Sequence, residues 1–184
     1  MGQAFFDAKA FNQALAEWNV SQCTEMGGMF SGASSFNYPI NNWDVSSVEG
    51  FQNMFEGALA FNQNIGDWDT SKVLSMWMMF RGAENFNQPL DRWNVSACSQ
   101  MYLMFGSATS FNQDLSMWDM TNAVFLPGMF DGATSFNQSL CRWQESLNLT
   151  VAEYDDMFRN TACPVMDDPV QNPATPGPFC QVCT

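Results

Sequence analysis

The sequence predicts an α/β solenoid in which each 25-residue repeat holds one short parallel strand and one short helix. Three columns of residues recur with this constant step. The first is a Phe followed by Asn: Phe11, Phe36, Phe61, Phe86, Phe111 and Phe136. The second is a Trp: Trp18, Trp43, Trp68, Trp93, Trp118 and Trp143. The third is a Met-Phe pair, beginning at Met29, Met54, Met79, Met104 and Met129. A fixed period of this length is typical of a chain in which each unit packs mainly against its neighbours.

The strand is expected at the Trp column. In the unit spanning residues 40–61, Trp43 and Val45 alternate with Asp44 and Ser46. This alternation predicts a short strand with Trp43 and Val45 facing inward. Stacked units would then form a parallel ladder with about 4.8 Å between successive strands.

The helix is expected directly after the strand. Ser46 or Ser47 is a candidate N-cap, and Gly57 lies where such a helix would end. Between them, apolar residues follow one another at helical spacing. They are Val48, Phe51, Met54, Phe55 and Ala58.

The apolar columns are expected to form the core, and the Asn column a hydrogen-bonded ladder between adjacent coils. The repeats begin within a unit at Met1 and continue over residues 1–162, which corresponds to about six repeats. Residues 163–184 are rich in Cys and Pro and are expected to form a C-terminal cap.

The repeat pattern F-x-G-A-x-x-F-N-Q-x-I/L-x-x-W-D/N-V/T-S resembles the short tandem repeats of bacterial surface proteins and lipoproteins. These repeats are related to the BspA-like leucine-rich repeats and are also widespread in unicellular algae. The resemblance implies a leucine-rich-repeat-like solenoid on a cell surface with an adhesive or interaction role. No catalytic residues are known for the family, so none are implied for this chain.

The composition of the chain disfavours several classes of partner and catalytic mechanism. The chain has a net charge of −13, which disfavours nucleic acid and anionic membranes as partners. It contains no His, which excludes Ser-His-Asp and Cys-His catalysis. No apolar run has the length of a membrane span. We therefore expect a protein that is not an enzyme and that has no cofactor or resident metal.

The six cysteines fall into two groups. Cys23 and Cys98 occupy one column, three coils and about 14 Å apart, which is too far for a disulfide. They are expected to be free and buried. Near the C-terminus the expectation is two disulfides, with any of three pairings, and the alternative is one zinc site. These residues are Cys141, Cys163, Cys180 and Cys183. Disulfides would place the protein in an oxidising compartment: extracellular, at the cell surface or in an organelle lumen.

Glycosylation is expected at Asn148, since this sequon lies in the only insertion of the repeat array. The sequons at Asn19 and Asn94 share a strand motif and are read as accidents of the repeat. The sequon at Asn137 belongs to the Asn ladder and is expected to be inaccessible.

Two surfaces are candidate binding sites. One is a polar ledge along the strand face, formed by Asp44, Asp69 and Asp119 with the Ser or Thr two positions after each. These carboxylates could accept hydrogen bonds from their own turns, or they could bind glycans or Ca²⁺. The other is an apolar patch on the outward helix positions of the middle units, unless its members lie half-buried between helices. It comprises Leu74, Trp77, Met78, Tyr102, Leu103, Val124 and Phe125.

The expected function is non-enzymatic binding of a protein or glycan, at a surface or in an extracellular or luminal space. The alternative is a structural or scaffolding subunit of a larger multi-protein assembly, docked through the apolar patch.

Overall fold

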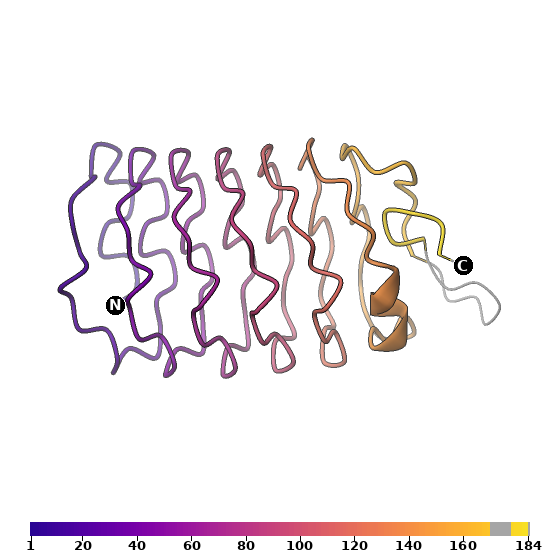
Figure 1. Ribbon diagram of the computed structural model, residues 1–184, viewed down its shortest axis with the longest axis horizontal. Coiled ribbons are helices and arrows are strands. Elements are labelled where there is room, and N and C mark those ends of the chain that lie inside the picture. The colour runs from indigo at the N-terminus through magenta and orange to yellow at the C-terminus, as the bar shows by residue number, and fades with distance from the viewer. Residues whose placement is uncertain (170–177, 184) are drawn as a thin grey trace.

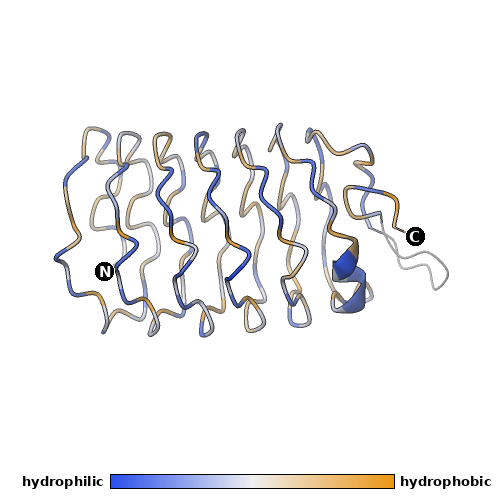
Figure 2. Cartoon of the chain, viewed as in Figure 1, coloured by the Kyte–Doolittle hydropathy of each residue, from blue (hydrophilic) through white to orange (hydrophobic). Residues whose placement is uncertain are grey.

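The structure is a computed structural model that describes residues 1–169 and 178–183. The chain winds into a stack of similar coils that follow one another along one axis, from the N-terminal end to the C-terminal end (Figure 1). Within the described residues, the only regular helix is the 3₁₀ helix η1, Cys141–Glu145, in the last part of the stack. The same succession of polar and apolar segments returns from coil to coil (Figure 2).

The prediction of an α/β solenoid of strand–helix repeats, similar to leucine-rich repeats, is wrong. The described residues contain no α-helix and no strand, only isolated parallel bridges between adjacent coils. These bridges connect Glu25, Gly50, Ser75, Gln100, Phe125 and Glu153 in series. Residues 43–45 form neither a bridge nor a turn, and residues 52–57 form a continuous run of turns.

The run of turns explains why the helix is absent. At odd-numbered positions of residues 51–57, the backbone N–H donates to a carbonyl of the next coil, over 2.8–3.0 Å. The pairs are Phe51 with Ser75, Asn53 with Trp77, Phe55 with Met79 and Gly57 with Arg81. The even-numbered N–H groups of residues 54–58 donate to the carbonyl three residues earlier in their own coil. An α-helix needs every N–H to donate four residues back, so this alternation excludes it.

Two residues with left-handed backbone in each coil also exclude an α-helix. Asn53 has a φ of 56° and Gly57 a φ of 65°, and equivalent positions in other coils are also left-handed. Met78 and Leu103 adopt φ values of 56° and 48° although they are not glycine. A left-handed residue ends an α-helix, and two of them within five positions leave room only for turns.

The apolar columns form the core, as predicted. Phe30, Phe55, Phe80, Phe105 and Phe130 stack in one file with ring centroids 5.5–5.7 Å apart. The Phe column at 36, 61, 86, 111 and 136 forms a second file, and these rings are fully buried. Stacked rings of this kind contribute beyond the apolar area that they bury.

From Trp43 to Trp143 the Trp column is also buried, whereas Trp18 is 39% exposed. The indole groups of the buried members connect each coil to the previous one. The Nε1–H of Trp43 donates to the carbonyl of Leu15 over 3.0 Å, and that of Trp68 to Ile40 over 3.3 Å. Trp93, Trp118 and Trp143 repeat this bond to Ile65, Leu90 and Leu115. Each bond satisfies a carbonyl that has no sheet partner.

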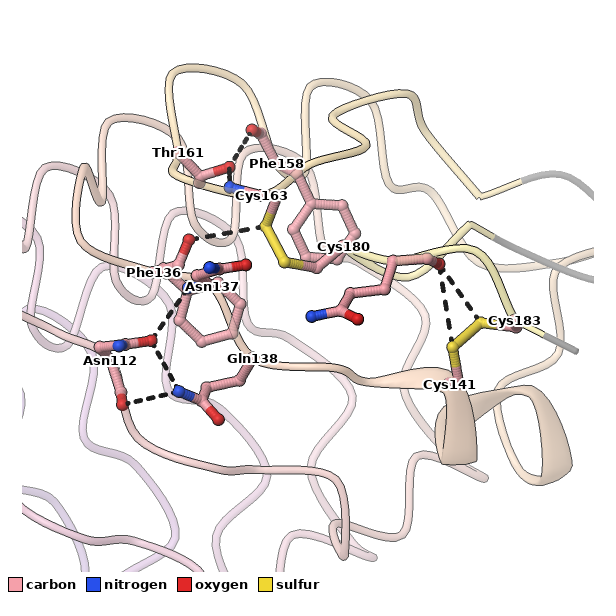
Figure 3. The surroundings of a disulfide bond; sticks show 11 residues. Asn112, Phe136, Asn137, Gln138, Cys141, Phe158, Thr161, Cys163, Cys180 and Cys183 are labelled. Atoms are coloured by element: carbon pink, nitrogen blue, oxygen red, sulfur yellow. Dashed lines mark hydrogen bonds between the residues drawn. A yellow bond between two sulfur atoms is a disulfide. The ribbon is translucent and has the colours of Figure 1, made fainter.

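The predicted Asn ladder is confirmed. The Oδ1 of each Asn accepts the backbone N–H of the equivalent Asn in the next coil over 2.9–3.0 Å, from Asn12 to Asn137. The following Gln also donates its side-chain amide to this oxygen in several coils, for example Gln138 to Asn112 over 2.9 Å (Figure 3). Asn137 itself is exposed, so the expectation that it is inaccessible is wrong.

Candidate binding face

The outward positions of the turn segment differ in size from coil to coil. The position equivalent to Trp77 holds Gly2, Gly27, Gln52, Tyr102, Pro127 and Asp155 in the other coils. The position equivalent to Met78 holds Gln3, Gly28, Asn53, Leu103, Gly128 and Asp156. Large apolar side chains therefore occur together in the two central coils. Trp77, Met78, Tyr102 and Leu103 are all half-buried, and together we call them the central ridge.

The structure brings only some of the predicted apolar patch into contact with the ridge. Phe125 lies against Tyr102, with 5.5 Å between the ring centroids. Leu74 and Val124, which are 51% and 44% exposed, lie two coils apart. Ser99 lies between them, bonded through its backbone to both. The patch thus consists of the ridge with Phe125, and of Leu74 and Val124, which Ser99 separates. Trp77 and Tyr102 are half-buried, as the alternative interpretation held, but between turns of adjacent coils and not between helices.

Two hollows flank the ridge, and the sequence did not predict them. The N-terminal hollow has a volume of about 450 Å³ and extends from Gln3 and Phe6 to Trp77. The C-terminal hollow has a volume of about 390 Å³ and is bounded by Tyr102, Leu103 and Arg159. Glycines create this space: Gly27 and Gly28 in the first hollow, Gly106 and Gly128 in the second. The sequence does contain a signal for the hollows: at the positions equivalent to Trp77 and Met78, glycine in some coils alternates with large residues in others.

Ion pairs neutralise most charged groups around the hollows. Glu56 accepts from Arg81 over 2.8 Å. Arg159 binds Asp131 and also Asp156, the latter over 2.9 Å. A hydrogen bond from the Arg159 guanidinium holds the pKa of Asp131 below its ordinary range. The C-terminal hollow therefore has a strongly charged wall, whereas the only ionisable group lining the N-terminal one is Glu56.

The polar ledge is a series of tight local turns and not the strand face that was expected. Asp44 accepts from the N–H of Ser46 over 3.1 Å and from its hydroxyl over 2.7 Å. Asp69 and Asp119 make the same turn with the residue two positions later. The hydroxyl and then the N–H of that residue hold the pKa of all three carboxyls below its ordinary range. The local interpretation of these residues is therefore confirmed. Among the described residues, no group of three or more His, Cys, Asp or Glu could hold a metal.

We expect the variant Asp44→Asn/Asp69→Asn/Asp119→Asn to be less sensitive to acid than the wild type. A carboxyl with a lowered folded-state pKa stabilises the fold above its unfolded pKa of about 3.9, and this stability is lost as pH falls through the folded value. Asparagine keeps the turn, as the equivalent bonds of Asn19 and Asn94 show, but does not titrate. Melting temperatures measured from pH 7 to pH 2 should fall less for the variant than for the wild type. Parallel curves would contradict this assignment.

Two disulfides attach the C-terminal segment to the last coils, as predicted (Figure 3). Cys141 at the start of η1 pairs with Cys183, and Cys163 pairs with Cys180. The zinc alternative is wrong, because all four thiols are consumed in these bonds. Phe179 is fully buried beside them, and its carbonyl accepts the N–H of Leu140 over 3.2 Å.

Cys23 and Cys98 are free, as predicted. Burial raises the pKa of the Cys98 thiol to about 12, so this thiol is chemically inert. Cys23 is only half-buried, which corrects the expectation that both lie in the core.

The glycosylation candidate Asn148 is exposed, but it does not lie in an inserted loop. Its Oδ1 accepts from the N–H of Thr150 over 3.1 Å and from its hydroxyl over 2.6 Å. This is the turn that Asp44 forms with Ser46, so Asn148 belongs to a regular coil. The additional residues precede it, around η1.

A family described as "Mycoplasma protein of unknown function, DUF285" matches residues 1–80 and 61–167. The chain belongs to this family. The match extends over the whole stack of coils and is consistent with the expected relationship to bacterial surface repeats. No curated protein and no solved structure matches the chain. In the part of the chain that the structure describes, no helix combines the length and the apolar character of a membrane span.

Proposed function

We propose that this DUF285 protein is a non-enzymatic binding module that engages a protein or glycan at a cell surface or in an extracellular or luminal space. The observation that carries the proposal is the central ridge. Its aromatic side chains Trp77 and Tyr102 stand between two hollows, at positions where other coils have glycine, glutamine, proline or aspartate. Half-buried aromatic residues on a rigid base are the usual anchors of binding surfaces.

The disulfides and the family match support the proposed location. Two disulfides in one small segment are typical of oxidising compartments. The family match supports a bacterial surface repeat protein, and we propose a relationship to the BspA-like repeats on the quoted motif.

The alternative is a scaffolding subunit of a larger assembly. Leu74, Val124 and Phe125 favour it, because they are 51%, 44% and 37% exposed, and Phe125 also packs against Tyr102 of the ridge. Permanent interfaces bury more apolar residues of this kind than transient ones. Size-exclusion chromatography with light scattering separates the two: a monomer at micromolar concentration supports the binding module, and obligate association supports the scaffold.

The test of the proposal is a ridge variant. The double variant Trp77→Ala/Tyr102→Ala should weaken binding to its ligand by about tenfold or more, because truncated anchors commonly cost at least 1.4 kcal/mol. Binding is measured on a panel of immobilised glycans and on surface proteins extracted from the native source. The control is Leu59→Ala, which removes an exposed residue outside the ridge and should leave binding unchanged. Equal binding by both variants would contradict the ridge as the site.

A further inference from the structure

We infer that the N-terminal hollow binds a neutral saccharide, with Trp77 as the stacking wall and Gln52 as the main hydroxyl-binding group; this inference rests on the proposed binding function. The hollow extends across four successive coils and has a volume of about 450 Å³, within the range of small-molecule sites. Its two ends are aromatic: Trp77 is half-buried, and Phe6 is 53% exposed. Aromatic faces of this kind are suited to the C–H face of a sugar ring, which is apolar, while hydroxyls point sideways.

The floor of the hollow offers polar groups that are not otherwise used. The side-chain amides of Gln3 and Gln52 make no hydrogen bond within the described residues, and an amide both donates and accepts. The Gln52 amide lies over a glycine floor: a Cβ on Gly50 would come within 2.6 Å of its Oε1, and one on Gly27 within 3.2 Å. These glycines therefore keep the space that the amide occupies.

Ser31 provides an independent sign that the hollow is built for a polar ligand. It lines the hollow and is only 6% exposed, and its hydroxyl makes no hydrogen bond within the described residues. No fully enclosed side-chain oxygen or nitrogen in that part of the chain lacks a partner. The Ser31 hydroxyl is therefore not fully enclosed, and because Ser31 lines the hollow, a hydroxyl of the ligand could bond to it.

The charges favour a neutral ligand. Glu56 is already bound to Arg81 over 2.8 Å and to Asn53 over 2.6 Å. The described residues that line the hollow include no Lys or Arg, so they offer no cation to an acidic sugar, and the chain's net charge of −13 repels anions.

The backbone disfavours an extended peptide. The N–H groups of Gln3, Gly28 and Asn53 all donate to carbonyls of the next coil, over 2.7–3.0 Å. A peptide that adds to an edge needs unpaired main-chain groups, and the floor of the hollow does not present such a row. Side chains must therefore recognise the ligand in this hollow. Side-chain amides and hydroxyls are suited to a ligand rich in hydroxyl groups.

The test is a titration of the full chain with neutral and acidic oligosaccharides, followed by NMR. The neutral probes are cellobiose, maltotriose, chitobiose and mannobiose at millimolar concentration, and the acidic probe is an oligogalacturonate. We expect at least one neutral probe to shift the indole N–H signal of Trp77 and the side-chain amide of Gln52 with saturation. The oligogalacturonate should shift neither.

Variants locate the site. Gln52→Ala and Trp77→Ala should each weaken binding of the responsive probe by about tenfold. Leu59→Ala, which removes a residue that is 41% exposed and lies outside both the ridge and the hollow, should change it less than about twofold. Unchanged melting temperatures show that the variants are folded. Failure of every neutral probe to shift these signals, or equal loss in Leu59→Ala, overturns the inference. A protein ligand that depends on Tyr102 while no sugar binds would overturn this inference but leave the proposed function standing.

Discussion

Replacement of Phe80 by alanine is expected to lower the free energy of unfolding by about 3–5 kcal/mol. Phe80 is fully buried in the middle of the first Phe file. Its ring centroid lies 5.7 Å from that of Phe55, 5.5 Å from that of Phe105 and 4.1 Å from that of Phe86. The truncation removes contacts in three successive coils at once, and a rigid stack cannot close around the resulting cavity.

Two variants control for this result. Phe80→Leu retains most of the volume and should cost clearly less than the alanine variant. Phe6→Ala removes a Phe that is 53% exposed, and should change stability by no more than about 0.5 kcal/mol. Urea unfolding followed by tryptophan fluorescence measures all three. A loss below about 1 kcal/mol for Phe80→Ala would mean that the files do not form the core.

The variant Cys163→Ser/Cys180→Ser is expected to lose about 2–5 kcal/mol. The bond closes a 17-residue separation, for which chain-entropy arguments give about 3 kcal/mol. The pair also lies at the end of the Phe files, where the Cys163 sulfur contacts the carbonyl of Phe136 over 3.6 Å (Figure 3). Losing it should release the segment that covers the last coil.

The matched control is Cys23→Ser, which changes a free, half-buried thiol and should have little effect. Hydrogen exchange shows where stability is lost: the backbone N–H of Leu140, bonded to the carbonyl of Phe179, should lose its protection first. A double variant as stable as the wild type would show that the disulfide does not support the stack.

Column periodicity predicted the core and the Asn ladder, because each depends only on which residues recur. The two disulfides were predicted from the four cysteines near the C-terminus. Column periodicity could not distinguish a helix from a run of turns. Val48, Phe51 and Met54 face inward in both, since two successive turns bring every third residue to the same side. The deciding feature is the left-handed backbone at Met78 and Leu103, and residues of these types give no sequence signal for it.

The binding face was predicted only in part. The large apolar side chains of Trp77 and Tyr102 were evident from the positions of these residues in the repeat. Leu74, Ser99 and Val124 occupy equivalent positions in three successive coils, so the sequence itself places Ser99 between the two apolar residues. The assumption of a helix obscured this order. The hollows depend on where glycines lie relative to the ridge in space, and the free amide of Gln52 becomes apparent only when its neighbours are known.

The central claim is that each 25-residue passage completes one coil, so that equivalent side chains stack in files. Hydrogen–deuterium exchange of the seven tryptophan indole N–H groups tests it most directly. The indoles of Trp43, Trp68, Trp93, Trp118 and Trp143 bond a carbonyl of the previous coil and should exchange slowly. Those of Trp18 and Trp77 make no such bond within the described residues and should exchange fast. Fast exchange of all seven, or protection that does not follow this division, would contradict the stack.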